Sequence, residues 1–249
     1  MKPRRIAAIV RKEALELTRE KRFLAPMIIV PVLVVGNVVW LVLSVMSRTQ
    51  TQDESTITMA TLSLRFTPAM AVLTGALCAS LAGVLAIDSF TGERERKTLE
   101  PLLVSPLSES EIVLGKIAAS CWLPTVLGCV AVAVFVAIMY FKMDRVWFGA
   151  SFDACRIGLL MLIPPVLSCV LTGCVAILSN YFSSMRSISQ VVFLPLTGVL
   201  VLLTTASHHV LSASLALQLA FAASGVVLAT ATTWLAVKLF RRERFASAQ

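Results

Sequence analysis

The sequence predicts an all-α polytopic membrane protein with six transmembrane helices. Hydrophobic residues make up 57% of the 249 residues and charged residues only 14%, with a mean hydropathy of +0.86. Soluble domains contain roughly 45–50% apolar and about 25% charged residues. Most of the apolar residues here fall in runs of about 18 or more, the length that a helix needs to cross the hydrocarbon layer. The sequence therefore leaves little room for a soluble domain.

The basic residues are distributed unevenly between the two sides of this predicted topology. Of the 22 Lys and Arg residues, 17 fall on the side that carries both termini and five on the opposite side. The positive-inside rule then places both termini in the cytoplasm. The formal net charge of +8 comes from residues beside the spans, where lipid headgroups are the expected partners. We therefore expect membrane lipid, and no nucleic acid, to be bound.

Residues 1–22 predict a cytoplasmic amphipathic helix that lies along the membrane surface. Ile6, Ile9, Val10 and Leu17 recur at three- and four-residue spacing while the basic side chains face elsewhere. The alternative is a solvated basic extension that only sets the orientation. The apolar run that follows is too long for the core of a removable signal peptide, so we expect the first span to act as its own targeting signal.

The six predicted spans form one membrane domain, residues 23–240, followed by a cytoplasmic tail, residues 241–249. The last run is longer than one crossing needs. Residues 207–218 are therefore alternatively a short re-entrant or interfacial turn. The predicted spans are residues 23–47, 66–88, 117–141, 157–182, 188–206 and 213–240.

The segment TGERERKTLEPLLVSPLSESE, residues 91–111, separates the second and third spans and is dense in charge. Leu99, Leu102 and Leu103 fall at i, i+3 and i+4, which predicts a short helix over residues 98–104 with one apolar face. Ser108 and Glu111 form an SxxE capping-box pattern before the next span. The apolar face is either a docking element for a cytosolic partner or a surface that packs back against the spans or the lipid.

The run ERERKTLEPLLVSPLSESEIVLGK resembles the loop between the second and third spans of type-2 ABC transporter permeases. In that family the loop carries a coupling helix that fits a groove in the ATP-binding subunit. The N-terminal helix resembles the family's connecting helix, and NYFSSMRSISQVVFLPL, residues 180–196, resembles its short turn between spans four and five. The resemblance covers essentially the whole chain, although only the loop is motif-specific.

The resemblance implies a transport subunit in the cell membrane, here the cell inner membrane, with no catalytic, cofactor or metal site of its own. It implies two copies of an ABC ATP-binding subunit as partners, which bind the ATP and Mg²⁺. It also implies a second permease copy, identical or similar, with the substrate path at the interface. The residues that it assigns to partner coupling are Glu93, Arg94, Glu95, Arg96, Lys97, Thr98, Leu99, Glu100, Leu102 and Leu103.

The chemistry of the chain agrees with an energy source on another polypeptide. The sequence contains no GxxxxGKS or GxxxxGKT phosphate loop: Gly115-Lys116 follows Ser110 where a glycine is needed and precedes Ile117. Ion-driven carriers place ionisable groups at mid-membrane. The polar residues within these spans are mostly neutral, and we expect them to form hydrogen bonds between helices rather than to contact substrate; they are Asn37, Ser80, Thr172, Gln190 and Thr197.

Two other functions remain open from the residues alone. A membrane scaffold would use the same loop to recruit a partner without transport, and an ion-coupled secondary transporter would work without ATP.

No CxxC pair occurs among the six cysteines, and five of the six lie inside apolar runs, which predicts small core residues. His208 and His209 are adjacent and point apart on a helix, so we expect surface residues and no metal site. The nature of the substrate does not follow from the sequence.

Overall fold

The structure is a computed structural model, and it describes residue 10 and residues 21–49, 55–92, 109–142, 145–182, 184–212 and 215–239. Regular structure in these ranges is entirely helical. Most of the predicted N-terminal amphipathic helix and the whole 241–249 tail lie outside the described residues. The coupling segment of the loop, residues 93–103, lies outside them as well.

Six long helices correspond one to one with the six predicted spans, and the predicted fold class is confirmed. Five of them are long and apolar enough to cross a membrane, while the first contains a shorter apolar stretch, Ile28–Trp40. The chain is therefore a multi-pass membrane protein. The helices are α2 (Lys21–Thr49), α3 (Ser55–Ile87), α6 (Glu109–Lys142), α8 (Ala154–Leu178), α9 (Met185–Ser212) and α10 (Leu215–Leu239).

Several helices extend beyond the predicted spans. α3 begins at Ser55, well before the apolar run, and α6 begins at Glu109, directly after the Ser108 of the capping box. α9 continues to Ser212 because no Gly or Pro interrupts it after Gly198. Within residues 207–218, α9 runs to Ser212 and α10 begins at Leu215, so the described part of the segment is helical, and the alternative of a re-entrant or interfacial position stays a prediction.

A short helix that the sequence did not predict, α7 (Arg145–Ser151), connects α6 to α8. The centre of its Phe148 ring lies 5.2 Å from the ring centre of Tyr140, at the end of α6, and 5.2 Å from that of Phe152. The Asp153 carboxylate then accepts a hydrogen bond from the Ala154 backbone N–H at 2.9 Å, which caps α8 at its start. Aromatic side chains and a cap thus fix the turn between the two spans.

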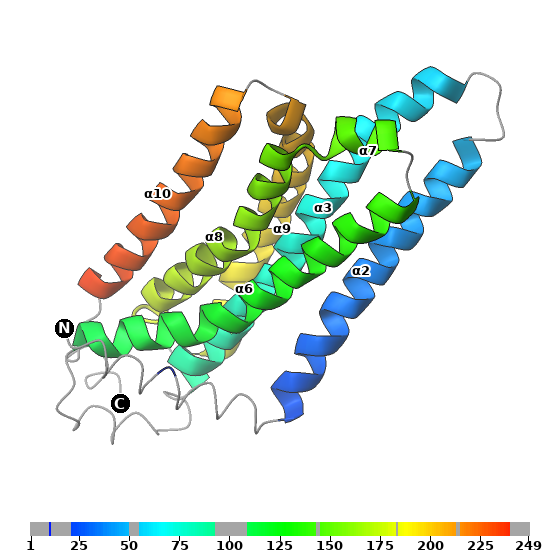
Figure 1. The fold of residues 1–249 in the computed structure, drawn as a ribbon. Helices are drawn as coiled ribbons and strands as arrows, with labels where there is room; N and C mark the ends of the chain where they lie inside the picture. Colours follow the sequence, from blue (N-terminus) through cyan, green and yellow to red (C-terminus); the bar gives the residue numbers. More distant parts are fainter. Residues whose placement is uncertain are drawn as a thin grey trace.

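α3 is the central helix of the bundle and contacts α2, α6, α8 and α9, whereas α2 and α10 lie at opposite edges (Figure 1). α3 and α6 run antiparallel. Glycines allow close contact between helices: a Cβ added to Gly75 of α3 would lie 3.0 Å from Val132 of α6, and one added to Gly128 of α6 would lie 2.7 Å from Pro164 of α8. Small residues at such contacts are typical of membrane helix bundles.

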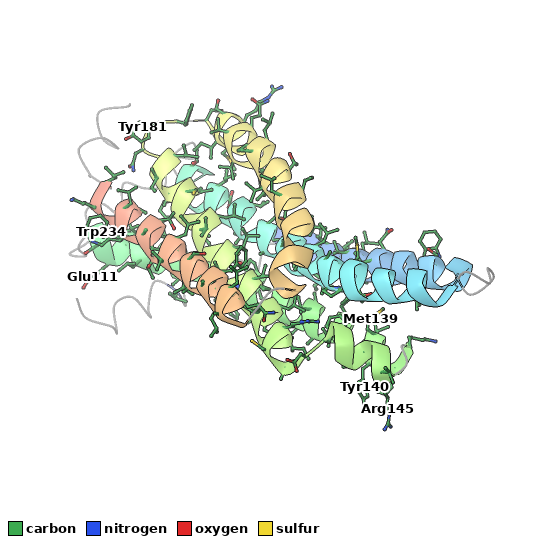
Figure 2. All side chains as sticks on the ribbon, turned by 90° about the horizontal axis from the view of Figure 1, so that it is seen from above. Glu111, Met139, Tyr140, Arg145, Tyr181 and Trp234 are labelled. Carbon is green, nitrogen blue, oxygen red and sulfur yellow. The ribbon has the colours of Figure 1, made fainter. Side chains whose placement is uncertain are left out.

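The helices meet in two apolar clusters, one toward each end of the bundle. We call one end the loop end, because α3 stops and α6 starts there and residues 93–108 connect them. Glu111, Tyr181 and Trp234 lie toward the loop end, and Met139, Tyr140 and Arg145 lie toward the opposite end (Figure 2). The cluster at the loop end contains Ala86, Ile87, Phe90, Val113, Ile117, Cys121, Leu171, Val175, Ala176, Ile188, Val192, Leu196 and Ala236.

Candidate functional site

The residues predicted to couple the chain to a partner all lie outside the described residues. The assignment of residues 93–103 therefore stays a prediction, as does the short helix over residues 98–104. The structure does describe where this loop leaves the bundle, at Gly92, and where it returns, at Glu109. These two ends form the candidate site.

The exit of the loop is a π-helical turn, η1 (Asp88–Gly92), that continues α3. Ser89, Phe90, Thr91 and Gly92 are all buried there. π-helical turns are uncommon and are frequent at functional sites. The chain therefore reaches the loop inside the protein rather than on its surface.

Close packing holds the end of η1 against α9. A Cβ added to Gly92 would lie 2.8 Å from the Asp88 carboxylate oxygen and 3.6 Å from the Met185 methyl group at the start of α9. Thr91 is 0% exposed, and its hydroxyl has no hydrogen-bond partner in the part of the chain that the structure describes. An unpaired buried hydroxyl is energetically costly, so this turn is held in place by its surroundings.

Lys116 of α6 connects the two ends of the loop. Its ammonium group donates a hydrogen bond to the Ser89 backbone carbonyl at 2.6 Å and a longer one to the Ser89 hydroxyl at 3.4 Å. The same nitrogen lies 5.7 Å from the centre of the Phe90 ring. The residue is only 2% exposed. We call Ser89, Phe90, Thr91, Gly92 and Lys116 the loop base.

The position of Lys116 has a direct physical reason. Carbonyls in the last turn of a helix have no N–H partner within the helix, and a cationic side chain there satisfies them and interacts favourably with the helix dipole. The loop base thus supplies a charged donor to the end of α3, from a residue 27 positions further along the chain.

Lys116 is not among the functional residues predicted from the sequence. A signal was nevertheless present. On α6, the buried residues Val113, Ile117 and Ser120 share a face with position 116. The helical register therefore predicts a buried lysine, and a lysine that is buried needs an acceptor.

The return of the loop is buried as well. Glu111 in the first turn of α6 is 4% exposed, and an acidic residue there is favourable at a helix N-terminus. Phe90, Val113 and Ile117 belong to the apolar cluster that joins α3, α6, α8, α9 and α10. The loop base is therefore in the same packed cluster as five of the six long helices.

The neutral polar groups within the spans occupy three kinds of position. Ser80 and Thr197 donate to carbonyls of their own helices, at Leu77 and Leu194, and not to another helix as expected. Thr172 of α8 is buried, donates to the Ser168 carbonyl at 2.9 Å, and shares a hydrogen bond of 2.9 Å with the Cys121 thiol of α6. This contact fits the expected hydrogen bond between helices. Asn37 and Gln190, in contrast, are exposed on the outside of α2 and α9.

A scan against protein-family models matches residues 7–240 to the family described as ABC-2 family transporter protein. The chain belongs to the ABC-2 transporter family. The match includes the loop and both of its ends, and it confirms the resemblance drawn from the loop motif. A comparison with curated proteins finds no match.

Membership in the ABC-2 family gives the helical bundle a role. The chain is a transmembrane permease of the ABC transporter type, and permeases of this family generally work with ATP-binding subunits. In an ABC-2 permease the segment between the second and third long helices is the expected contact with that subunit. The loop base joins the two ends of that segment within the bundle.

Proposed function

We propose that this chain is the permease subunit of an ATP-driven exporter and that residues 93–103 couple it to separate ATP-binding subunits. Leu99, Leu102 and Leu103 form the buried face of the contact, and Glu95, Arg96, Lys97 and Glu100 form its rim. Closure of the ATP-binding subunits pushes the loop, and the spans respond as rigid bodies.

One observation supports the proposal: a charged segment, predicted to be cytosolic, is connected at both ends to buried positions among the spans. Gly92 packs against Met185, and Lys116 bonds to Ser89. A loop that only linked two spans would not need a buried base, whereas a loop that transmits force does, because force is lost in a flexible attachment.

The Gly115-Lys116 pair supports the same assignment. Both residues lie within α6, and the Lys116 ammonium is bonded to Ser89, whereas the lysine of a phosphate loop reaches the phosphates of the nucleotide. ATP and Mg²⁺ are therefore proposed to bind the partner subunit and not this chain.

We also propose that the permease pairs with a second copy of itself or with a similar chain. Asn37 lies in the apolar stretch of α2 and Gln190 near the start of α9, and both are exposed. A side-chain amide that faces lipid lacks hydrogen-bond partners, so such residues usually face another helix or a water-filled path. A second copy packed against α2 and α9 would give both amides hydrogen-bond partners.

Cross-linking in native membranes tests the coupling. With a lysine-reactive cross-linker, we expect Lys97 to link to a protein that contains a GxxxxGKS or GxxxxGKT loop. Lys142 is exposed at the opposite end of the bundle and serves as the internal control, which should not link to that protein. Linkage of the ATP-binding protein to Lys142 rather than Lys97 would contradict the proposal.

Loop variants test the function itself. Leu102→Asp should abolish the substrate-stimulated ATPase activity of the complex because it places a charge in the proposed buried face. Glu95→Lys combined with Glu100→Lys should do the same because it reverses charges in the proposed rim. Membrane insertion should persist, since the substitutions lie outside the spans. A scaffold would recruit the ATP-binding protein without changing its ATPase rate, and a secondary transporter would remain active after ATP depletion.

A further inference from the structure

We propose that Lys116 is a positioning residue for coupling, which ties the end of α3 to α6 so that both ends of the loop move as one unit. The inference rests on the proposed function and concerns how a push on the loop reaches the spans. It assigns a mechanical role to a residue that lies outside the partner contact.

The packing of α3 against α6 shows why a link near the loop end matters. Near the middle of the two helices, small residues allow close contact: a Cβ on Gly75 would lie 3.0 Å from Val132 of α6, and one on Gly128 would lie 3.6 Å from Cys78 of α3. Ser89 and Lys116 continue the same antiparallel pairing toward the loop end. There the link is a hydrogen bond of 2.6 Å.

The chemistry of the contact suits a strong link between the two helices. A hydrogen bond with a charged donor is roughly twice as strong as a neutral one, and the surrounding burial strengthens it further. The acceptor is a main-chain carbonyl, so the hydrogen bond fixes the backbone of η1 and does not depend on a side chain that can rotate. The Ser89 hydroxyl lies further away, at 3.4 Å, and contributes less.

The position of the Lys116–Ser89 hydrogen bond determines which helices a movement of the loop reaches first. The Lys116 ammonium lies over Phe90, and Phe90 packs in the apolar cluster with Ile188 of α9 and Val175 of α8. Glu111, one turn before Lys116, lies at the end of the bundle that receives the loop (Figure 2). With the tie intact, α3 and α6 move together against this cluster. Without it, each end of the loop moves separately.

The test uses the chain in lipid nanodiscs with the ATP-binding subunit that purifies with it. Lys116→Met keeps the length and apolar stem of the side chain but removes the donor, and Lys116→Arg restores a cationic donor. We measure the affinity for the ATP-binding subunit and the change in its ATPase rate caused by the chain.

We expect Lys116→Met to bind the ATP-binding subunit as tightly as wild type while its effect on the ATPase rate falls at least about fivefold, the low end of ordinary coupling between sites. Lys116→Arg should recover most of the effect. A purely structural lysine would lower the yield of folded protein but leave the effect per complex unchanged, and that result overturns the proposal.

A second measurement in the wild-type chain keeps the test decisive if Lys116→Met does not fold. Spin-labelled amino acids at Val84 of α3 and Ala118 of α6, both exposed beside the tie, report the distance between the helices. The distance should be the same without nucleotide and with ATP and vanadate. A change of about 2 Å or more, the size of ordinary helix shifts, overturns the proposal.

The outcomes separate this inference from the proposed function. If the wild-type chain neither binds the ATP-binding subunit nor alters its ATPase rate, the proposed function fails and the inference fails with it. If the wild-type chain alters the rate and Lys116→Met alters it equally, only the role of Lys116 is overturned.

Discussion

Single residues without a large side chain decide how closely the spans pack. Gly128 of α6 faces Pro164 of α8, and Gly173 of α8 faces Thr232 of α10, in both cases with no space for a methyl group. Both glycines thus lie at close contacts between helices within the chain. The rigid proline ring explains why Gly128 is the least replaceable of them.

Gly128→Ala should destabilise the protein by about 1–3 kcal/mol, because its Cβ would lie 2.7 Å from the Pro164 Cβ and overpacking costs this much. Gly158→Ala is the matched control, since nothing lies within 4 Å of a Cβ at that position. Its stability should stay within about 0.5 kcal/mol of wild type. Thermal unfolding in detergent, followed by size-exclusion chromatography, measures both, and equal losses would contradict the packing.

Thr172→Val should cost about 1 kcal/mol, the usual value of a hydrogen bond between membrane helices, because Thr172 links α8 to the Cys121 thiol of α6. Thr230→Val is the control. The Thr230 hydroxyl is exposed and bonds only to carbonyls of its own helix, at Val226 and Val227. The same unfolding assay compares them, and a loss for Thr230→Val as large as that for Thr172→Val would contradict the assignment.

At the scale of elements, the long spans were predictable and the short elements between them were not. A run of apolar residues long enough to cross a bilayer has few alternatives to a helix, because every backbone group must be satisfied internally. η1 and α7 depend on contacts from other helices: η1 on Lys116 and Met185, and α7 on the Tyr140 ring. Local sequence does not contain that information.

The candidate site divides in the same way. The charged loop and its docking leucines could be predicted from spacing and resemblance, and they remain a prediction. The loop base could be predicted only in part: the register of α6 indicates that Lys116 is buried, but its acceptor is a backbone carbonyl of Ser89, which no residue pattern identifies.

Phe148→Ala should loosen α7 and lower the stability of the protein by about 3 kcal/mol, because Phe148 packs against Tyr140 and Phe152. Phe141→Ala is the control, since Phe141 is 82% exposed and should lose much less. Unfolding of the two variants in the same detergent compares them. Similar losses would indicate that α7 is not anchored by this ring.

For the whole molecule, the direction of the bundle in the membrane is a prediction from the distribution of basic residues. Lys238 lies near the end of α10, toward the loop end, and Lys142 ends α6 at the opposite end, and both are exposed. In sealed cells stripped of any outer envelope, an amine reagent that cannot cross membranes should modify Lys142 and spare Lys238, as identified by peptide mass spectrometry. In inverted vesicles the pattern should reverse. Modification of Lys238 from outside would contradict the predicted cytoplasmic position of the loop.

In the proposed function two polypeptides have separate roles: this chain is the permease, and a separate ATP-binding subunit drives its movement through the loop. The most direct measurement is the ATPase rate of the purified subunit alone, with this chain in nanodiscs, and with its Leu102→Asp variant. We predict that the chain alone hydrolyses no ATP, that it changes the rate of the subunit severalfold, and that Leu102→Asp restores the rate of the free subunit. ATP hydrolysis by the chain alone, or a subunit rate that ignores its presence, would contradict the account.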